Sequence, residues 1–239
     1  QGLQASIDSG GQRLAGPRPS PRISLPEFGG WTHVFEPLAR QIRDFRLPPP
    51  LLHALLDAFE QDVHSPRYPD RESLLDYCRR SANTVGRLLL HLHGIDDAAW
   101  LARSDEICSA LQLINFWQDL SVDGPRGRHY VPAADRSRHG VSIAELRERR
   151  DSVRTRALVR ELCDWAGSMM RAGAPLALHL PGRAGWELRL VVQGGLRILE
   201  KIRRLEHASM VQRPRLTALD LPPLLWRAWS MPGVLIGAA

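Results

Sequence analysis

The chain has 239 residues, 44% of them hydrophobic and 6% aromatic, and its net charge is +6. This length and apolar content suffice for one substantial core, so we predict a single domain. Leu, Ala and Arg dominate the composition, which favours helix over sheet. The positive charge does not indicate a nucleic-acid-binding protein, because the arginines alternate with acidic residues, as between Arg147 and Arg156, and form no dense basic tract.

Cysteine usage and hydropathy bear on the location of the protein. Cys78, Cys108 and Cys163 lie far apart and lack the spacing of a metal or redox motif. They predict free thiols in a reduced, cytoplasmic protein. No apolar run reaches the roughly 18 residues that a membrane-spanning helix needs. The apolar stretch 231–239 is too short to span a bilayer but can touch its surface, so a position peripheral to the inner membrane stays an alternative.

In chain order, the sequence opens with an irregular segment rich in Gly, Ser, Pro and Gln. Apolar residues then recur at helical spacing between proline-rich and glycine-rich breaks. The predicted helices cover about 31–47, 51–63, 71–94, 97–122, 142–150, 153–173, 185–207 and 217–229. No strand–helix alternation occurs, so we predict an all-α helical bundle. The expected organisation is an irregular segment over 1–30, a helical domain over 31–230 and an apolar tail over 231–239.

The predicted helix over 97–122 has one polar side. With about 3.6 residues per turn, four polar residues fall within an arc of about 80°: Gln112, Asn115, Asp119 and Asp123. This polar arc lacks Lys, Arg and Glu, and two of its carboxylates repel each other unless a cation intervenes. Two carboxylates beside an amide oxygen are suitable ligands for Mg²⁺ that bridges to a phosphate. A metal site and a solvated helix face both stay open on this pattern alone.

The predicted helix over 71–94 carries complementary features. Tyr77 and Ser81 share one face, whereas Ala82 and Gly86 share another. The small pair predicts close approach of a neighbouring helix, because glycine inside a helix costs about 1 kcal/mol and needs such a reason. Tyr77 by itself is more typical of a core tyrosine than of a catalytic one. We expect Tyr77 and the polar arc to face one common cavity between these two helices.

Two arginines follow the polar arc in the segment GPRGRHYVP. Arg126 and Arg128 lie just beyond the carboxylates and can hold a diphosphate through charge-assisted hydrogen bonds. Gly194 and Gly195, by contrast, lie inside an apolar helical run and form no phosphate-binding glycine loop. We predict close helix packing at this glycine pair.

Together these segments resemble the squalene/phytoene synthase family. YCRRSANTVG is similar to the family's tyrosine–cysteine helix, LQLINFWQDLSVD to its second aspartate-rich motif, and RGRHYVP to the segment after that motif. FEQDVHSPRY and GWELRLVVQGGLRILEKIRR resemble the hydroxysqualene synthase branch in particular. The resemblance covers roughly Trp31 to Arg213 with the motifs in the family's order. The combination is specific, whereas each motif alone is weak.

The resemblance implies a class I terpenoid-synthase fold and Mg²⁺-assisted ionisation of a prenyl diphosphate. For the hydroxysqualene branch the substrate is presqualene diphosphate, water captures the rearranged cation, and no nicotinamide is needed. The implied metal ligands are Asn115, Asp119 and Asp123. The implied catalytic residues are Tyr77, Asp119 and Asp123, and the implied substrate-binding residues are Gln112, Arg126 and Arg128.

Two features depart from the family's pattern. Squalene and phytoene synthases commonly carry Arg before the first aspartate of the second motif, where this chain has Gln118, which favours the hydroxysqualene branch. The family's first aspartate-rich motif, DxxxD, has no counterpart here, because Asp8 is isolated and Asp44 and Asp57 lack partners at that spacing. We therefore expect the N-terminal part of the family domain to be missing or replaced, and this chain to be slow or inactive.

Three hypotheses of function stay open. The leading one is conversion of presqualene diphosphate to hydroxysqualene, and the second is condensation of two prenyl diphosphates to presqualene diphosphate, squalene or phytoene. The third is a non-catalytic interaction protein, favoured by the missing motif and disfavoured by the retained Asp119 and Asp123. The expected partners are a prenyl diphosphate, other squalene-pathway enzymes and a membrane surface, not nucleic acid.

Overall fold

The computed structural model describes residues 30–64 and 67–236. It divides the chain into two units, one ending at Asp44 and one beginning at Phe45. In the first unit the described element is helix α1 (Thr32–Asp44). Every regular element in the described ranges is a helix, so the all-α prediction is confirmed. The irregular segment predicted over 1–30 lies outside the described residues except for Gly30.

The second unit contains long and short helices in sequence. Those that shape the candidate site are α2 (Pro49–Val63), α3 (Arg71–Cys78), a π-helical turn (Arg79–Asn83), α4 (Thr84–Leu92), α5 (Ala98–Gln118) and α6 (Leu120–Asp123). They are followed by α7 (Ala133–Arg138), α8 (Ile143–Arg147), α9 (Val153–Gly173), α10 (Leu176–His179), α11 (Gly182–Arg204), a 3₁₀ turn (Ala218–Asp220) and α12 (Leu221–Ile236).

Side-chain caps explain why several helices begin where the sequence predicts. The Asp70 carboxylate accepts a hydrogen bond from the backbone N–H of Ser73 at 2.8 Å, and the Ser73 side chain caps Asp70 in return. Asp97 accepts from the N–H of Ala99 at the start of α5. Each such cap satisfies a backbone donor that the first turn leaves free, and contributes typically about 1 kcal/mol.

The structure corrects several predicted helix boundaries. Helix α2 begins at Pro49, inside the proline run that we expected to precede it, because proline in the first turn gives up no intrahelical hydrogen bond. The predicted helix over 71–94 is interrupted by the π-helical turn, and the one over 97–122 is divided at Asp119. Helices α7 and α10 are short and were not predicted. Helix α12 continues to Ile236, into the stretch predicted as an apolar tail.

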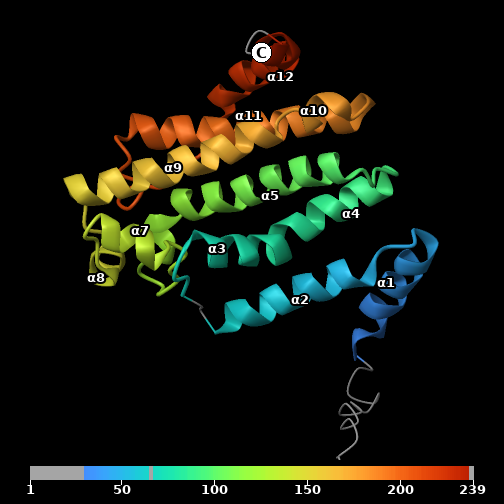
Figure 1. The fold of residues 1–239 in the computed structure, drawn as a ribbon, viewed down its shortest axis with the longest axis horizontal. Helices are drawn as coiled ribbons and strands as arrows, with labels where there is room; N and C mark the ends of the chain where they lie inside the picture. Colours follow the sequence, from blue (N-terminus) through green and yellow to red (C-terminus); the bar gives the residue numbers. More distant parts are fainter. Residues whose placement is uncertain (1–29, 65–66, 237–239) are drawn as a thin grey trace, which may run out of the picture. The chain divides into compact units, whose positions relative to one another are not determined.

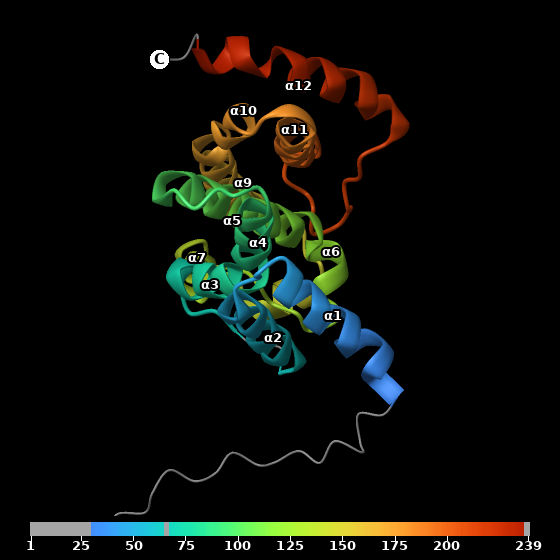
Figure 2. The same cartoon turned by 90° about the vertical axis from the view of Figure 1, so that its right-hand side faces the viewer.

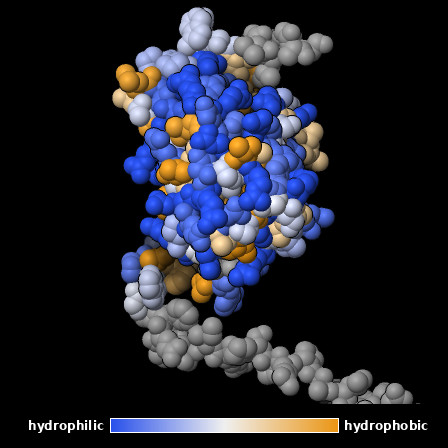
Figure 3. All heavy atoms as spheres, turned by 90° about the vertical axis from the view of Figure 1, so that its left-hand side faces the viewer, coloured by the Kyte–Doolittle hydropathy of each residue, from blue (hydrophilic) through white to orange (hydrophobic). Residues whose placement is uncertain are grey.

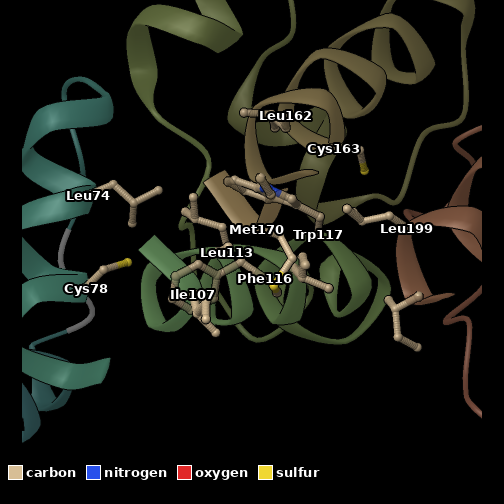
Figure 4. Packing of buried hydrophobic residues seen from close by; sticks show 14 of the residues in the cluster. Leu74, Cys78, Ile107, Leu113, Phe116, Trp117, Leu162, Cys163, Met170 and Leu199 are labelled. Carbon is tan, nitrogen blue, oxygen red and sulfur yellow. The ribbon is translucent and has the colours of Figure 1, made fainter. Parts of the chain in front are cut away.

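The core of the second unit forms where α5 lies beside α9 (Figures 1 and 2). Trp117 of α5 and Met170 of α9 are completely buried. Figure 4 shows them at the centre of the cluster, with Leu74 of α3 on one side and Leu199 of α11 on the other. Burying side chains of this size stabilises the fold by about 1.5–3 kcal/mol each. This packing fixes the position of α5, which carries Gln112 and Asn115 of the polar arc and ends just before Asp119.

Two glycines allow neighbouring helices to approach closely. A Cβ atom at Gly86 of α4 would lie 2.5 Å from the Cys108 sulfur of α5, and one at Gly195 of α11 would lie 2.8 Å from Met170 Cε. The predicted close packing is confirmed at both positions. At Gly194 the nearest atom would be 3.9 Å away, which is an ordinary contact.

The surface over α7, α8 and the start of α9 is mostly hydrophilic, with scattered hydrophobic side chains (Figure 3). This mixture agrees with a solvated helical surface in which arginines alternate with acids. The three cysteines are free thiols, and Cys78 and Cys163 are buried. None of the helices in the described part of the chain combines the length and the apolar character that crossing a bilayer requires.

Candidate functional site

The polar arc survives the division of the predicted helix at Asp119. Although the backbone of Asp119 leaves helical geometry (φ −97°, ψ 9°), its N–H still donates to the carbonyl of Asn115 at 2.9 Å. The N–H of Asp123 donates in turn to the carbonyl of Asp119 at 2.8 Å. These hydrogen bonds keep Asn115, Asp119 and Asp123 on successive turns, as the sequence predicts.

Arg213 forms a bidentate ion pair with Asp119. Its Nη2 donates to Oδ2 at 3.0 Å and its Nε donates to Oδ1. The loop that carries Arg213 is held in place because Gln118 Nε2 donates to the carbonyl of Pro214 at 2.7 Å. Sequence analysis missed Arg213, because it follows α11 and lies 94 positions from Asp119, beyond any local spacing signal.

Arg126 and Arg128 join the same charged group. The N–H groups of both residues donate to the carbonyl of Asp123, at 3.0 and 3.1 Å, so the turn after α6 folds back toward the acidic pair. Burial and the adjacent Asp119 carboxylate raise the pKa of Asp123, and the surrounding arginines oppose this shift. The structure thus brings together two carboxylates and three guanidinium groups at the end of α5.

The donor chemistry of this group fits Mg²⁺ in part. Asp119 and Asp123 supply carboxylate oxygens and Asn115 an amide oxygen, the hard ligands that Mg²⁺ prefers. Within the described ranges, however, no three His, Cys, Asp or Glu residues are grouped so as to hold a metal ion. Asp119 and Asp123 would therefore supply only part of the ligands that Mg²⁺ needs, and water and phosphate oxygens would have to supply the rest.

Tyr77 lies in a buried aromatic cluster, which we call the tyrosine cluster: Tyr68, Tyr77, Phe116 and Tyr130. Its ring centroid lies 5.7 Å from that of Tyr68, 6.1 Å from that of Tyr130 and 6.2 Å from that of Phe116. The Tyr77 hydroxyl donates to Asp62 Oδ2 of α2 at 2.8 Å. Burial and the Asp62 carboxylate raise the pKa of Tyr77 well above its ordinary value, so the phenol stays protonated.

Asp62 is the second residue that sequence analysis missed. It lies within FEQDVHSPRY, which we noted only for its resemblance to the hydroxysqualene branch. No spacing rule pairs a residue of α2 with one of α3 across the intervening turn. The tyrosine cluster also lies close enough to the charged group at the end of α5 for Asp123 to raise the pKa of Tyr130.

An apolar cavity of about 510 Å³ opens between α4, α5, α10 and α11. Its walls include Val85, Leu89, Leu111 and Leu188, with Gln112 among the few polar lining groups. Such a cavity suits a hydrocarbon chain.

Gln112 is the one predicted site residue that lines this cavity. Tyr77 and Asp119 do not line it, so our expectation that they face one common cavity is not met. The physical reason is that Asp62 binds the Tyr77 hydroxyl and Arg213 binds the Asp119 carboxylate.

The chain is similar in sequence to known proteins. The family model for squalene/phytoene synthase matches residues 3–220. The chain is 32% identical over 177 residues to a hydroxysqualene synthase of Sinorhizobium fredii, covering 73% of this chain and 60% of that protein. It is 30% identical over 138 residues to a 15-cis-phytoene synthase of Enterobacter agglomerans, covering 58% of this chain and 47% of that protein.

Solved structures show the same similarity. The structure of the squalene synthase HpnC from Alicyclobacillus acidocaldarius matches with a TM-score of 0.69 and 35% identity, over 72% of this chain and 66% of that one. A dehydrosqualene synthase matches with a TM-score of 0.68 at 20% identity, which supports the fold alone, over 79% of this chain and 67% of that one. The chain spans about 60% of the length of its hydroxysqualene synthase relative from Sinorhizobium. It belongs to the squalene/phytoene synthase family.

Proposed function

We propose that this protein converts presqualene diphosphate to hydroxysqualene and releases diphosphate, in a Mg²⁺-dependent reaction. The observation that carries the proposal is the arrangement along α5: its middle lines an apolar cavity and its end holds two carboxylates among three arginines. A substrate that joins a long hydrocarbon to a diphosphate needs both environments side by side. The hydroxysqualene synthase relative supports the choice of product.

At the charged end, the chain would bind and neutralise the leaving group. Asn115, Asp119 and Asp123 would hold Mg²⁺, which supplies positive charge to the departing diphosphate when it is bound. Arg126 and Arg128 would donate hydrogen bonds to the diphosphate oxygens. Such preorganised donors favour the charge that develops as the carbon–oxygen bond breaks.

Arg213 would contribute at the same end by exchanging partners. In the structure Arg213 forms an ion pair with the Asp119 carboxylate. Because this pair is half-exposed, breaking it costs little free energy. If Asp119 held a metal ion, the Arg213 guanidinium would be free to bind a diphosphate oxygen. Arg213 would thus neutralise the charge of Asp119 before the substrate binds and the charge of the diphosphate afterwards.

At the apolar end, the cavity would receive the hydrocarbon and protect the cation. Its lining is mainly aliphatic, which would limit the water that reaches a carbocation. Gln112, at the cavity wall two turns before the acidic group, would orient the substrate between the two environments. Water completes the proposed reaction, so the reaction needs no hydride donor.

The location and the partners of the protein belong to the same proposal. We propose that the protein lies in the cytoplasm at the surface of the inner membrane. There it would have access to its apolar substrate and to other enzymes of squalene synthesis. Helix α12 supports surface contact, because Trp226 and Trp229 are 64% and 65% exposed and their rings lie 5.2 Å apart.

The test is a product assay with presqualene diphosphate. We expect hydroxysqualene and diphosphate in the presence of Mg²⁺ and neither in its absence. Because this chain lacks the first aspartate-rich motif, we expect it to be slower than a full-length hydroxysqualene synthase by about 10²-fold or more.

Control reactions separate the alternatives. Farnesyl diphosphate alone tests the condensing activity, and NADPH tests a reductive squalene synthase. Presqualene diphosphate formed from farnesyl diphosphate, or squalene formed only with NADPH, would replace the proposed reaction. Absence of diphosphate release from every substrate would instead favour the non-catalytic interaction protein.

A further inference from the structure

Asp62 and Tyr77 form a hydrogen bond in which the phenol is the donor and the carboxylate is the acceptor. Asp62 Oδ2 accepts the Tyr77 hydroxyl at 2.8 Å, while Oδ1 is buried and accepts no hydrogen bond from the described residues. A buried carboxylate oxygen without a donor is costly and demands an explanation. Tyr77 is thus the hydrogen-bond donor to this carboxylate among the described residues.

Tyr77 is correspondingly fixed as a donor to Asp62. Its hydroxyl hydrogen is directed at Asp62, so the phenol oxygen can still accept a hydrogen bond, and the neighbouring Tyr130 hydroxyl is hydrogen-bonded to it. The buried tyrosine cluster keeps the phenol neutral, because burial disfavours the phenolate. Tyr77 can therefore take up one proton only by passing its own to Asp62.

The proposed reaction produces one proton at its last step. When water attacks a carbocation, the new carbon–oxygen bond leaves a protonated alcohol that must lose a proton to become hydroxysqualene. The diphosphate would leave at the charged end of α5, and the tyrosine cluster lies beside that end, so the cluster would offer a proton acceptor separate from the diphosphate itself. General-base groups of this kind typically contribute about 10²–10⁴-fold to rate.

We propose that Tyr77 and Asp62 form a proton relay for the water that captures the cation. Water forms its bond to carbon and gives a proton to Tyr77 Oη, while the Tyr77 hydroxyl proton moves to Asp62 Oδ2. The products are the alcohol, a neutral tyrosine and a protonated Asp62, which then releases its proton to solvent. Asp62 acts through Tyr77 and is a positioning residue and final acceptor. This relay rests on the proposed function.

The placement of the pair agrees with this role. Ser81, one turn after Tyr77, and Gln112, one turn before Phe116, both line the apolar cavity. Phe116 contacts Tyr77 across the helices, with ring centroids 6.2 Å apart. Tyr77 thus lies one helical turn beyond the cavity wall, between the cavity and the charged end of α5.

Other titratable and charged groups surround the relay on each packed element. They are Tyr68 and Tyr130 in the tyrosine cluster, Cys78 on α3, Asp123 and Arg128 beyond α5, and Arg80, which donates to Gln61 of α2 at 2.6 Å. The Asp62 charge raises the pKa of all three tyrosines. Removing that charge must therefore lower the pH at which the phenols ionise.

The first test uses the fact that the chain has three tyrosines, all of them in the tyrosine cluster. Tyrosinate absorbance, read immediately after a jump to alkaline pH and before unfolding, reports on this cluster alone. In the wild type we expect ionisation well above the ordinary value of about 10, with the pKa of Tyr130 at about 12.

The variants make this test specific. In Asp62→Asn, which keeps an oxygen that accepts from Tyr77, we expect ionisation to begin at lower pH. Asp57→Asn is the matched control, because Asp57 is an exposed aspartate of the same helix, and it should titrate as the wild type. Tyr77→Phe should remove one phenol from the curve. Equal curves for Asp62→Asn and Asp57→Asn would overturn the pairing.

The second test measures the alcohol formed per diphosphate released from presqualene diphosphate. This ratio does not depend on how fast the chain turns over. We expect Asp62→Asn to keep diphosphate release but to lower the alcohol yield by about 10²-fold, with the cation lost by elimination. An alcohol yield equal to that of Asp57→Asn would refute the relay. No diphosphate release from the wild type would refute the proposed function, and the phenol titration then decides on the Asp62–Tyr77 pair.

Discussion

The two polar regions of the second unit hold charge in opposite ways. At the end of α5, Asp119 is balanced by Arg213, with side chains 27% and 35% exposed, so water and salt share in the balance. At the tyrosine cluster, Asp62 is balanced by one phenol hydroxyl among buried rings. The first arrangement can exchange partners cheaply and suits a ligand that comes and goes. The second cannot, and suits the transfer of a proton between two side chains that stay in place.

Among the predicted changes, loss of Asp119 should lower activity the most, because it removes a proposed metal ligand from the charged group at the end of α5. We expect Asp119→Ala to abolish the coupling between Mg²⁺ and inorganic diphosphate binding and to lower turnover by about 10²–10³-fold. Calorimetric titration of diphosphate with and without Mg²⁺ measures the coupling. Asp96→Ala, at an exposed loop aspartate, is the control and should bind as the wild type. Unchanged coupling in Asp119→Ala would remove the metal assignment.

Breaking the buried contact should cost more folding free energy than breaking the exposed one. Tyr77→Phe leaves the Asp62 carboxylate with no donor for Oδ2, so we expect the free energy of unfolding to fall by about 1.5–3 kcal/mol. Urea denaturation measures it. A loss that disappears at high salt would show that Asp62 is solvated in the same way as Asp119.

Arg213→Gln tests the exposed contact in the same experiment. We expect a loss of about 0.2–1 kcal/mol that becomes smaller as salt is added, because the ion pair is half-exposed. Arg204→Gln, at an exposed arginine at the end of α11, is the matched control. A salt-independent loss as large as that of Tyr77→Phe would make the two regions equivalent.

The features that the sequence predicted correctly depend on residues close together in the chain. The starts of the helices predicted over 71–94 and 153–173 are correct, and each is fixed by a cap within three residues, Asp70 in the first and Ser152 in the second. The polar arc was also found, because it lies on one helix. The residues that pair with Asp119 and Tyr77 were not found from the sequence. Arg213 and Asp62 reach their targets only through the packing of α11 and α2, which no spacing within one helix encodes.

The tyrosine helix shows the same limit at finer scale. An unbroken α-helix places Ser81 and Ala82 on different faces, yet both line the cavity. The π-helical turn Arg79–Asn83 changes the phase of the residues that follow it. The α-helical repeat of about 3.6 residues per turn therefore does not predict which residues on opposite sides of such a turn share a face.

That turn has a consequence for the gene as well as for the fold. A π-helical turn holds one residue more than the α-helix it interrupts, so it behaves as a single-codon insertion that the bundle has absorbed. Deleting one codon within 79–83 would therefore restore an unbroken α-helix, and Tyr77 before the turn and Val85 and Leu89 after it would keep their directions. Only the side chains inside the turn would change places, among them Ser81 and Ala82 of the cavity wall. The length of this helix, counted in residues, therefore affects the cavity wall and leaves the contact between Tyr77 and Asp62 intact.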